Sequence, residues 1–205
     1  MQTDNWVFDA TRPVAIQLRG PDGTKSIRVR FPSDDEWVER QRRRKVIVKS
    51  LGRNVSETLI PNREDVDAAL LAKIRSEDQP DVDAFEAQKI IEQLATCEVD
   101  DVVPVGDAFR VTLRVLGATT AHLLKMPSQK DVGAYRQGFA RILDLPYGRQ
   151  EFTINLRAAG DLYKAIIETT EGYAADVPVI HQAVAVKAAV DALDMTFAED
   201  RDTNF

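Results

Sequence analysis

A run of basic side chains has the clearest chemical potential in this sequence. Its members are Arg40, Arg42, Arg43, Arg44 and Lys45, followed by Lys49 and Arg53. Clustered cations attract the phosphates or carboxylates of a partner. The run also fits a solvated, salt-bridged helix face, because Glu36 and Glu39 each precede an arginine by four residues. The run is therefore the candidate partner-binding site, and the solvated face is the alternative.

The remaining groups that could do chemistry are few. Two histidines, His122 and His181, lack the spacing of metal ligands, and both are interpreted as structural. Cys97 is the only cysteine and ends an apolar stretch, which indicates a small core residue. The sequence contains no nucleophile elbow and no glycine-rich phosphate loop. We therefore expect no catalytic residues, no metal, no cofactor and no enzymatic activity.

One stretch of the chain occurs twice, at residues 14–33 and 109–128. The two stretches align without a gap at a constant offset (Pro127 − Pro32 = 95). Five of the twenty aligned pairs are identical, among them Leu18/Leu113 and Arg19/Arg114. The sequence therefore predicts a tandem duplication. The basic run has no counterpart in the second copy, where Tyr135 aligns with Arg40. This difference suggests either a partner specific to the first copy or a second-copy helix that is buried where the first is exposed, and Tyr135 and Phe139 support the burial.

Each copy is expected to begin with a β-hairpin and continue with three helices. In the first copy, strands alternate over residues 14–18 and 26–31, and Ser33 with Glu36 forms a capping box. Helices are expected over residues 34–51, 63–77 and 82–96, and residues 98–107 read as a solvated linker. The second copy repeats the order and ends with an apolar helix over residues 178–193. In the second helix of each copy, the alignment runs at an offset of 96, with Asp65 against Asp161.

These elements define the domain organisation and the fold class. We expect a first unit at residues 13–100, a second at 105–197 and a mobile tail at 198–205. A lone hairpin is marginally stable, so the two hairpins could pool into one four-stranded antiparallel sheet in a pseudo-twofold α+β body. Two separate lobes are the alternative. Trp6, Val7 and Phe8 suggest an apolar arm that docks on this body.

Composition limits the classes of protein that remain. The chain has 205 residues, is 44% hydrophobic and 29% charged, and carries a net charge of −6. This composition is typical of a globular protein, and the acidic balance argues against bulk binding of nucleic acid. No apolar run approaches the length of a membrane span, and no signal peptide is recognised. With a single cysteine, these features predict a cytoplasmic protein that does not bind membranes.

The strand-to-helix junction of each copy resembles that of small phage tail proteins, in particular tail assembly chaperones. The matching residues are Phe31-Pro32-Ser33-Asp34-Asp35-Glu36 and Met126-Pro127-Ser128-Gln129-Lys130-Asp131. The resemblance covers about a third of the chain, and those proteins usually carry the unit once. It implies a non-catalytic cytoplasmic protein that binds another virion or tail component during assembly.

Three functional hypotheses follow from the sequence. The first is a non-enzymatic structural or assembly protein, phage- or prophage-related, that acts through protein–protein interaction. The second is a nucleic-acid-binding module that uses the basic run of the first copy. The third is an enzyme with its site between the copies.

Overall fold

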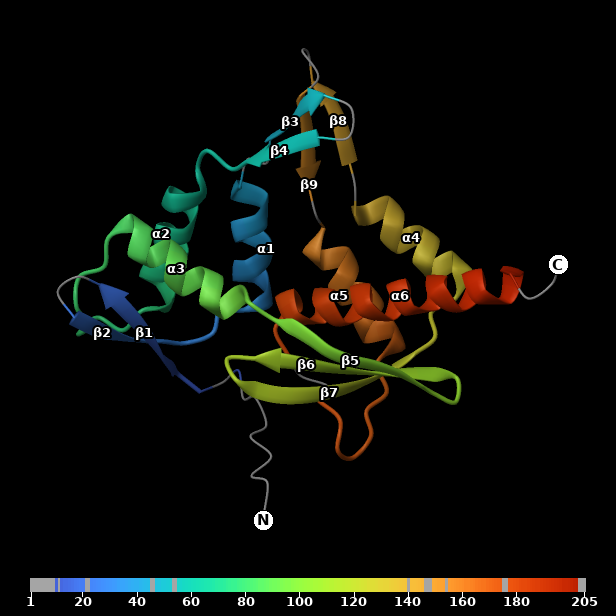
Figure 1. The fold of residues 1–205 in the computed structure, drawn as a ribbon. Coiled ribbons are helices and arrows are strands. Elements are labelled where there is room, and N and C mark those ends of the chain that lie inside the picture. The colour runs from blue at the N-terminus through green and yellow to red at the C-terminus, as the bar shows by residue number, and fades with distance from the viewer. Residues whose placement is uncertain are drawn as a thin grey trace. The chain divides into compact units, whose positions relative to one another are not determined.

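The computed structural model describes residues 10, 12–20, 23–44, 47–52, 55–139, 141–145, 149–153, 155–174 and 177–202, with side chains outside 45–58, 138–154 and 196–205. Within these residues the chain is α+β, with six helices and three antiparallel sheets (Figure 1). The predicted fold class is confirmed at this level. The apolar arm at Trp6, Val7 and Phe8 lies outside the described residues.

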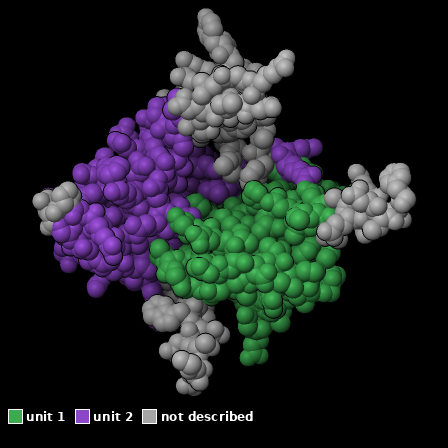
Figure 2. Space-filling model, viewed as in Figure 1, with its two compact units in different colours: residues 1–9, 96–135, 157–205 green, residues 10–95, 136–156 purple. Residues whose placement is uncertain are grey.

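The chain divides into two compact units (Figure 2). Unit 1 takes residues 96–135 and 157–205 together with 1–9, and unit 2 takes residues 10–95 and 136–156. Of the two units predicted at 13–100 and 105–197, residues 96–100 of the first lie in unit 1 and residues 136–156 of the second lie in unit 2.

Unit 2 begins with a two-stranded hairpin of β1 (Val14–Gly20) and β2 (Gly23–Val29). Alternate residues point inward, as a half-buried sheet requires, and the inward residues are Ile16, Leu18, Ile27 and Val29. Helices α1 (Asp34–Arg43), α2 (Arg63–Ile74) and α3 (Ala84–Ala95) follow. Trp37 of α1 and Ile90, Ile91 and Leu94 of α3 are fully buried and fill the core of this unit.

Helix α1 is shorter than the sequence analysis predicted, so the expected helix over residues 34–51 is wrong. The helix ends at Arg43, and β3 (Ile47–Gly52) then pairs with β4 (Val55–Leu59). The start of the helix is correct, because Ser33 caps it through the predicted box with Glu36. The β-branched pair Ile47-Val48 favours a strand, and β3 gains a ladder of hydrogen bonds that a longer helix would exclude.

The structure also has a four-stranded sheet, but its strands are not those of the predicted pooled sheet. Its order is β4-β3-β9-β8, where β8 is Arg141–Leu145 and β9 is Arg149–Thr153. The hairpin of β1 and β2 forms a sheet of its own, and the second repeated hairpin lies in a three-stranded sheet. The repeated hairpins therefore do not share one sheet.

Unit 1 contains that three-stranded sheet, formed by β5 (Glu98–Val105), β6 (Ala108–Val115) and β7 (Ala118–Lys125). The expected solvated linker at residues 98–107 is thus wrong. Its four valines have high strand propensity, and Gly106, with a φ of 62°, closes a tight turn into β6. The acidic residues that suggested a solvated linker lie on an exposed strand.

Three helices follow this sheet: α4 (Gln129–Phe139), which lies in unit 1 as far as Tyr135, α5 (Leu156–Ile166) and α6 (Val179–Asp202). Helix α6 packs against all three strands of the sheet, and Ala185, Val186 and Ala189 are buried in that contact. The helix was expected to end near Leu193, but it continues to Asp202, so residues 198–202 are helical. Residues 203–205 lie outside the described part of the chain.

Candidate functional site

The basic run divides into residues with different surroundings. Arg40 is buried and only 7% exposed, whereas Arg42 and Arg43 are exposed at the end of α1. Arg44 is half-buried just after the helix. The side chain of Lys49, on β3, and the residues Lys45 and Arg53 lie outside the described part. The four side chains of the run that the structure describes therefore do not form one exposed surface.

Arg40 is held by a buried carboxylate. Its Nε donates to Asp67 Oδ1 at 2.6 Å and its Nη2 to Asp67 Oδ2 at 3.2 Å, a bidentate pair that joins α1 to α2. Asp67 is completely buried, and the Arg40 guanidinium lies 5.4 Å from the centre of the Trp37 ring. Arg40 therefore serves the packing of unit 2 and is not displayed to a partner.

Arg44 and Arg63 extend this ion-pair cluster. Arg63 pairs with Glu92 of α3, and its Nε lies 3.9 Å from Asp67. Burial, with the positive charge of Arg40 nearby, lowers the pKa of Arg44 to about 10. Three cations and two anions thus meet here. These ion pairs join α1, α2 and α3, and they leave Arg42 and Arg43 as the exposed cations among the run's described side chains.

A small pocket lies between α1 and α2, beside these exposed cations. Its lining residues are Glu36, Glu39, Arg40, Arg43, Val66, Ala69, Leu70 and Lys73. Arg43 pairs with Glu39 at 2.8 Å, and Glu36 pairs with Arg30 at 2.7 Å. Arg30 lowers the pKa of Glu36 to about 2, so this carboxylate stays ionised. Charges of both signs line the pocket, and two of its three cations, Arg40 and Arg43, are already paired with carboxylates.

Unit 1 contains a buried polar cluster around His122. Its Nδ1 lies 2.7 Å from the hydroxyl of Tyr163 on α5, and its Nε2 lies 3.2 Å from the hydroxyl of Thr120. Both His122 and His181 are 0% exposed. Burial, together with the neighbouring His181, lowers the pKa of His122 to about 4, so the imidazole is neutral at neutral pH. This cluster fits the structural role expected of both histidines.

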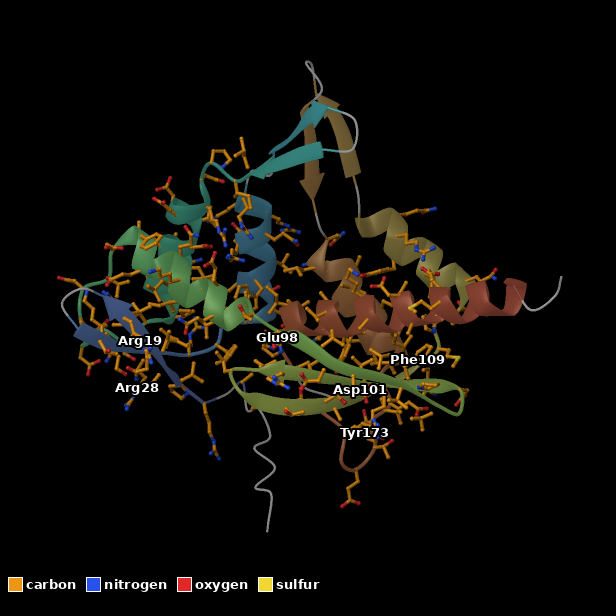
Figure 3. The ribbon with its side chains drawn as sticks, in the orientation of Figure 1. Arg19, Arg28, Glu98, Asp101, Phe109 and Tyr173 are labelled. Carbon is orange, nitrogen blue, oxygen red and sulfur yellow. The ribbon has the colours of Figure 1, made fainter. Side chains whose placement is uncertain are left out.

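The outer face of the unit 1 sheet carries ion pairs between β5 and β6. Arg114 pairs with Asp100 at 2.8 Å, and Arg110 lies 3.7 Å from Asp101. The register of β5 shifts between Val99 and Asp101, and such a bulge lets two consecutive carboxylates serve the same face. Glu98 and Asp101 are labelled on β5 in Figure 3.

The hairpin of unit 2 presents a similar outer face without such carboxylates. Arg19 of β1 and Arg28 of β2 are exposed there (Figure 3). Among the described residues of this unit, β1 pairs with β2 alone, and no ion pair is found for Arg19. An edge strand with unpaired backbone groups is a template for another strand. The edge of β1 is therefore the candidate interaction surface.

No metal centre or membrane span is found in the part of the chain that the structure describes. No three His, Cys, Asp or Glu residues in that part are grouped so that they could hold an ion. None of its helices combines the length and apolar character that crossing a bilayer requires. Burial raises the pKa of Cys97 to about 12, which suits a thiol and not a reactive thiolate.

Comparison with family models, with curated proteins and with solved structures gave no match. Inference about function therefore depends on the chain itself.

Two features of these surroundings were missed in the sequence analysis. The first is Asp67, the partner of Arg40. It precedes the buried Leu70 and Leu71 by three and four residues, so helical spacing places it on the apolar face of α2. The second is the edge of β1, which only the unequal pairing of the two hairpins reveals. No local pattern around residues 14–20 marks that edge.

Proposed function

We propose that this chain is a non-enzymatic structural or assembly protein, phage- or prophage-related, that acts in the cytoplasm by binding another protein. One observation carries the proposal: among the described residues β1 pairs with β2 alone, whereas β6, the first strand of the other repeated hairpin, is paired on both sides. Open strand edges bind extended segments by main-chain hydrogen bonds. The resemblance of the junctions at Ser33 and Ser128 to tail assembly chaperones supports the phage assignment.

The proposal includes a tandem duplication of one ancestral unit. In its support, β1 and β2 shifted by 95 residues coincide with β6 and β7 to within one residue at each end. Both α1 and α4 follow a serine that accepts a hydrogen bond from the amide three residues on, at 3.3 Å for Ser33 and 3.2 Å for Ser128. A pseudo-twofold arrangement of the copies remains a prediction.

The second helix of each copy also supports a duplication, but its alignment between the copies differs from the one inferred from sequence. Arg75, after α2, bridges to Val29, and Ile167, after α5, bridges to Leu124. Val29 and Leu124 are 95 residues apart, while Arg75 and Ile167 are 92 apart. The offset of 96 inferred from sequence for the second helices is thus four residues larger than the offset of 92 in the structure, a difference of about one helical turn. A slip of one turn keeps the same helix face inward, which explains why the residues still matched.

Purification of the tagged chain from its native lysate tests the proposed function. We expect a protein partner to be recovered in stoichiometric amount. Recovery with small metabolites and no protein partner would contradict the proposal.

Binding of nucleic acid is a second candidate, because Arg42 and Arg43 are exposed at the end of α1. It predicts an affinity that falls steeply with salt and is lost when both residues are changed to Glu. Reversal of the exposed Arg157, in unit 1, is the matched control. Salt-insensitive binding, or none, would exclude this candidate.

A further inference from the structure

We propose that the outer edge of β1 is a docking site for one extended strand of a partner protein, and that this strand carries a carboxylate opposite Arg19 and an apolar side chain toward α3. This inference deepens the proposed function and rests on the duplication proposed above. It names the surface on this chain and the chemistry of the segment that binds there.

The pairing of β5 with β6 supplies the geometry. Strand β5 runs antiparallel along the outer edge of β6, with Val102 opposite Val111 and Val103 opposite Arg110. Helix α6 packs against β5 as well as β6, so a residue on the inner side of β5 has a helix to contact. In unit 2, α3 packs against β1. A strand on the edge of β1 would therefore have both a backbone ladder and an apolar surface to contact.

The outer edge of β6 in unit 1 carries a paired arginine, and the corresponding edge of β1 in unit 2 carries the same arginine without an ion pair among the described residues. Arg114 of β6 pairs with Asp100 of β5 at 2.8 Å. Arg19 of β1 stands 95 residues earlier, is identical in type and is exposed, with no ion pair found among the described residues. The basic group that holds an acidic strand in unit 1 is thus present on β1, while the part of the chain that the structure describes places no acidic strand beside it. This complementarity indicates an acidic occupant.

The chain's own residues 3–10 stand at the same offset from β5, and two differences in sequence argue against them as the occupant. They carry Asn5 where β5 has the carboxylate Asp100. They are followed by Thr11 where β5 is followed by Gly106, whose φ of 62° closes the tight turn into β6. A β-branched threonine strongly disfavours positive φ. The observations therefore favour a strand supplied by another protein.

The probe is a capped peptide that copies Glu98–Val105 (EVDDVVPV), added to the isotopically labelled full chain at up to millimolar concentration. We expect chemical-shift changes at the amides of Val14–Gly20. An exposed ion pair is worth at most about fivefold in affinity, so Arg19→Gln should weaken binding by about two- to fivefold. The matched control is Arg28→Gln, an exposed arginine on the strand away from the edge, which should leave the affinity unchanged.

A second measurement does not depend on the folding of any variant. A peptide with Asn at the position of Asp100 should bind the unmodified chain about two- to fivefold more weakly, and it should bind the Arg19→Gln chain as the parent peptide does. This pattern pairs the carboxylate at the position of Asp100 with Arg19, as Asp100 pairs with Arg114 in unit 1.

Four outcomes would overturn the inference. They are no binding at millimolar peptide, shift changes at β6 through exchange with β5, equal weakening by Arg19→Gln and Arg28→Gln, and binding only after residues 1–12 are removed. The last would mean that the chain's own N-terminal segment occupies the edge. Recovery of an unchanged native partner with Arg19→Glu would reject this surface and leave the proposed function standing, whereas the absence of any protein partner rejects the proposed function itself.

Discussion

His122 should make unit 1 sensitive to acid. The imidazole is fully buried between Thr120 and Tyr163, with His181 nearby, and its pKa falls from an ordinary 6.5 to about 4. Because the folded state binds this proton less readily than the unfolded state, the stabilisation is complete above pH 6.5 and is lost as the pH falls toward 4. The shift corresponds to about 3 kcal/mol in all.

The perturbation that tests this reasoning is His122→Ile, since isoleucine is the residue at the aligned position 27 of the other hairpin. Urea unfolding, followed by circular dichroism, gives the free energy of unfolding at pH 7.5 and 4.5. Between these values the unmodified chain should lose about 2.5 kcal/mol more than the variant, because other titrating groups are common to both. The comparison uses pH dependence, so any cost of the substitution at neutral pH cancels. Parallel pH profiles for the two chains would refute the account of His122.

Three further predictions concern packing and reactivity. Asp67→Asn should destabilise unit 2 by about 3–5 kcal/mol in urea unfolding, because Arg40 loses its buried charged partner. The control Asp65→Asn, at an exposed position of the same helix, should change the free energy of unfolding by less than about 0.5 kcal/mol. Gly160→Ala should lower the free energy of unfolding by about 1–3 kcal/mol, since a Cβ there would lie 2.9 Å from the Val179 side chain. Gly133→Ala in α4 has open space around it and should stabilise the chain by about 0.5–1 kcal/mol. Thermal unfolding that ranks the two variants in the opposite order would contradict this. Cys97 in the folded chain should react with iodoacetamide at pH 8 at least about a hundredfold more slowly than in urea, and equal rates would show that its thiol is not shielded.

The elements with strong local signals were predictable from sequence. The hairpin strands, α2 and α3 follow from alternation and helical periodicity, and the capping box at Ser33 fixed the start of α1. The end of α1 was not predictable in the same way. The charges at Arg40 and Arg43 fit a continued helix. Strand β3 pairs with β4 next to it in the chain and also with β9, about a hundred residues away, and no local pattern shows the second pairing.

The wrong prediction for residues 98–107, which form β5, has a related cause. Its carboxylates suggested a solvated linker, and Asp100 gains a partner only when β5 lies beside Arg114. The basic run shows the same limit, because Arg40 is removed from the surface by Asp67, which lies 27 residues away. In both cases the sequence analysis failed because a charged residue pairs with a partner distant in sequence, which no local pattern reveals.

The most direct test of the central claim is amide hydrogen exchange of the full chain, free and in its purified complex with the native partner. Every second amide of β1 points away from β2, and these amides should exchange more slowly in the complex. The amides of β2 should be unchanged. Equal exchange of the β1 amides in the free chain and in the complex would contradict the claim that this edge binds the partner.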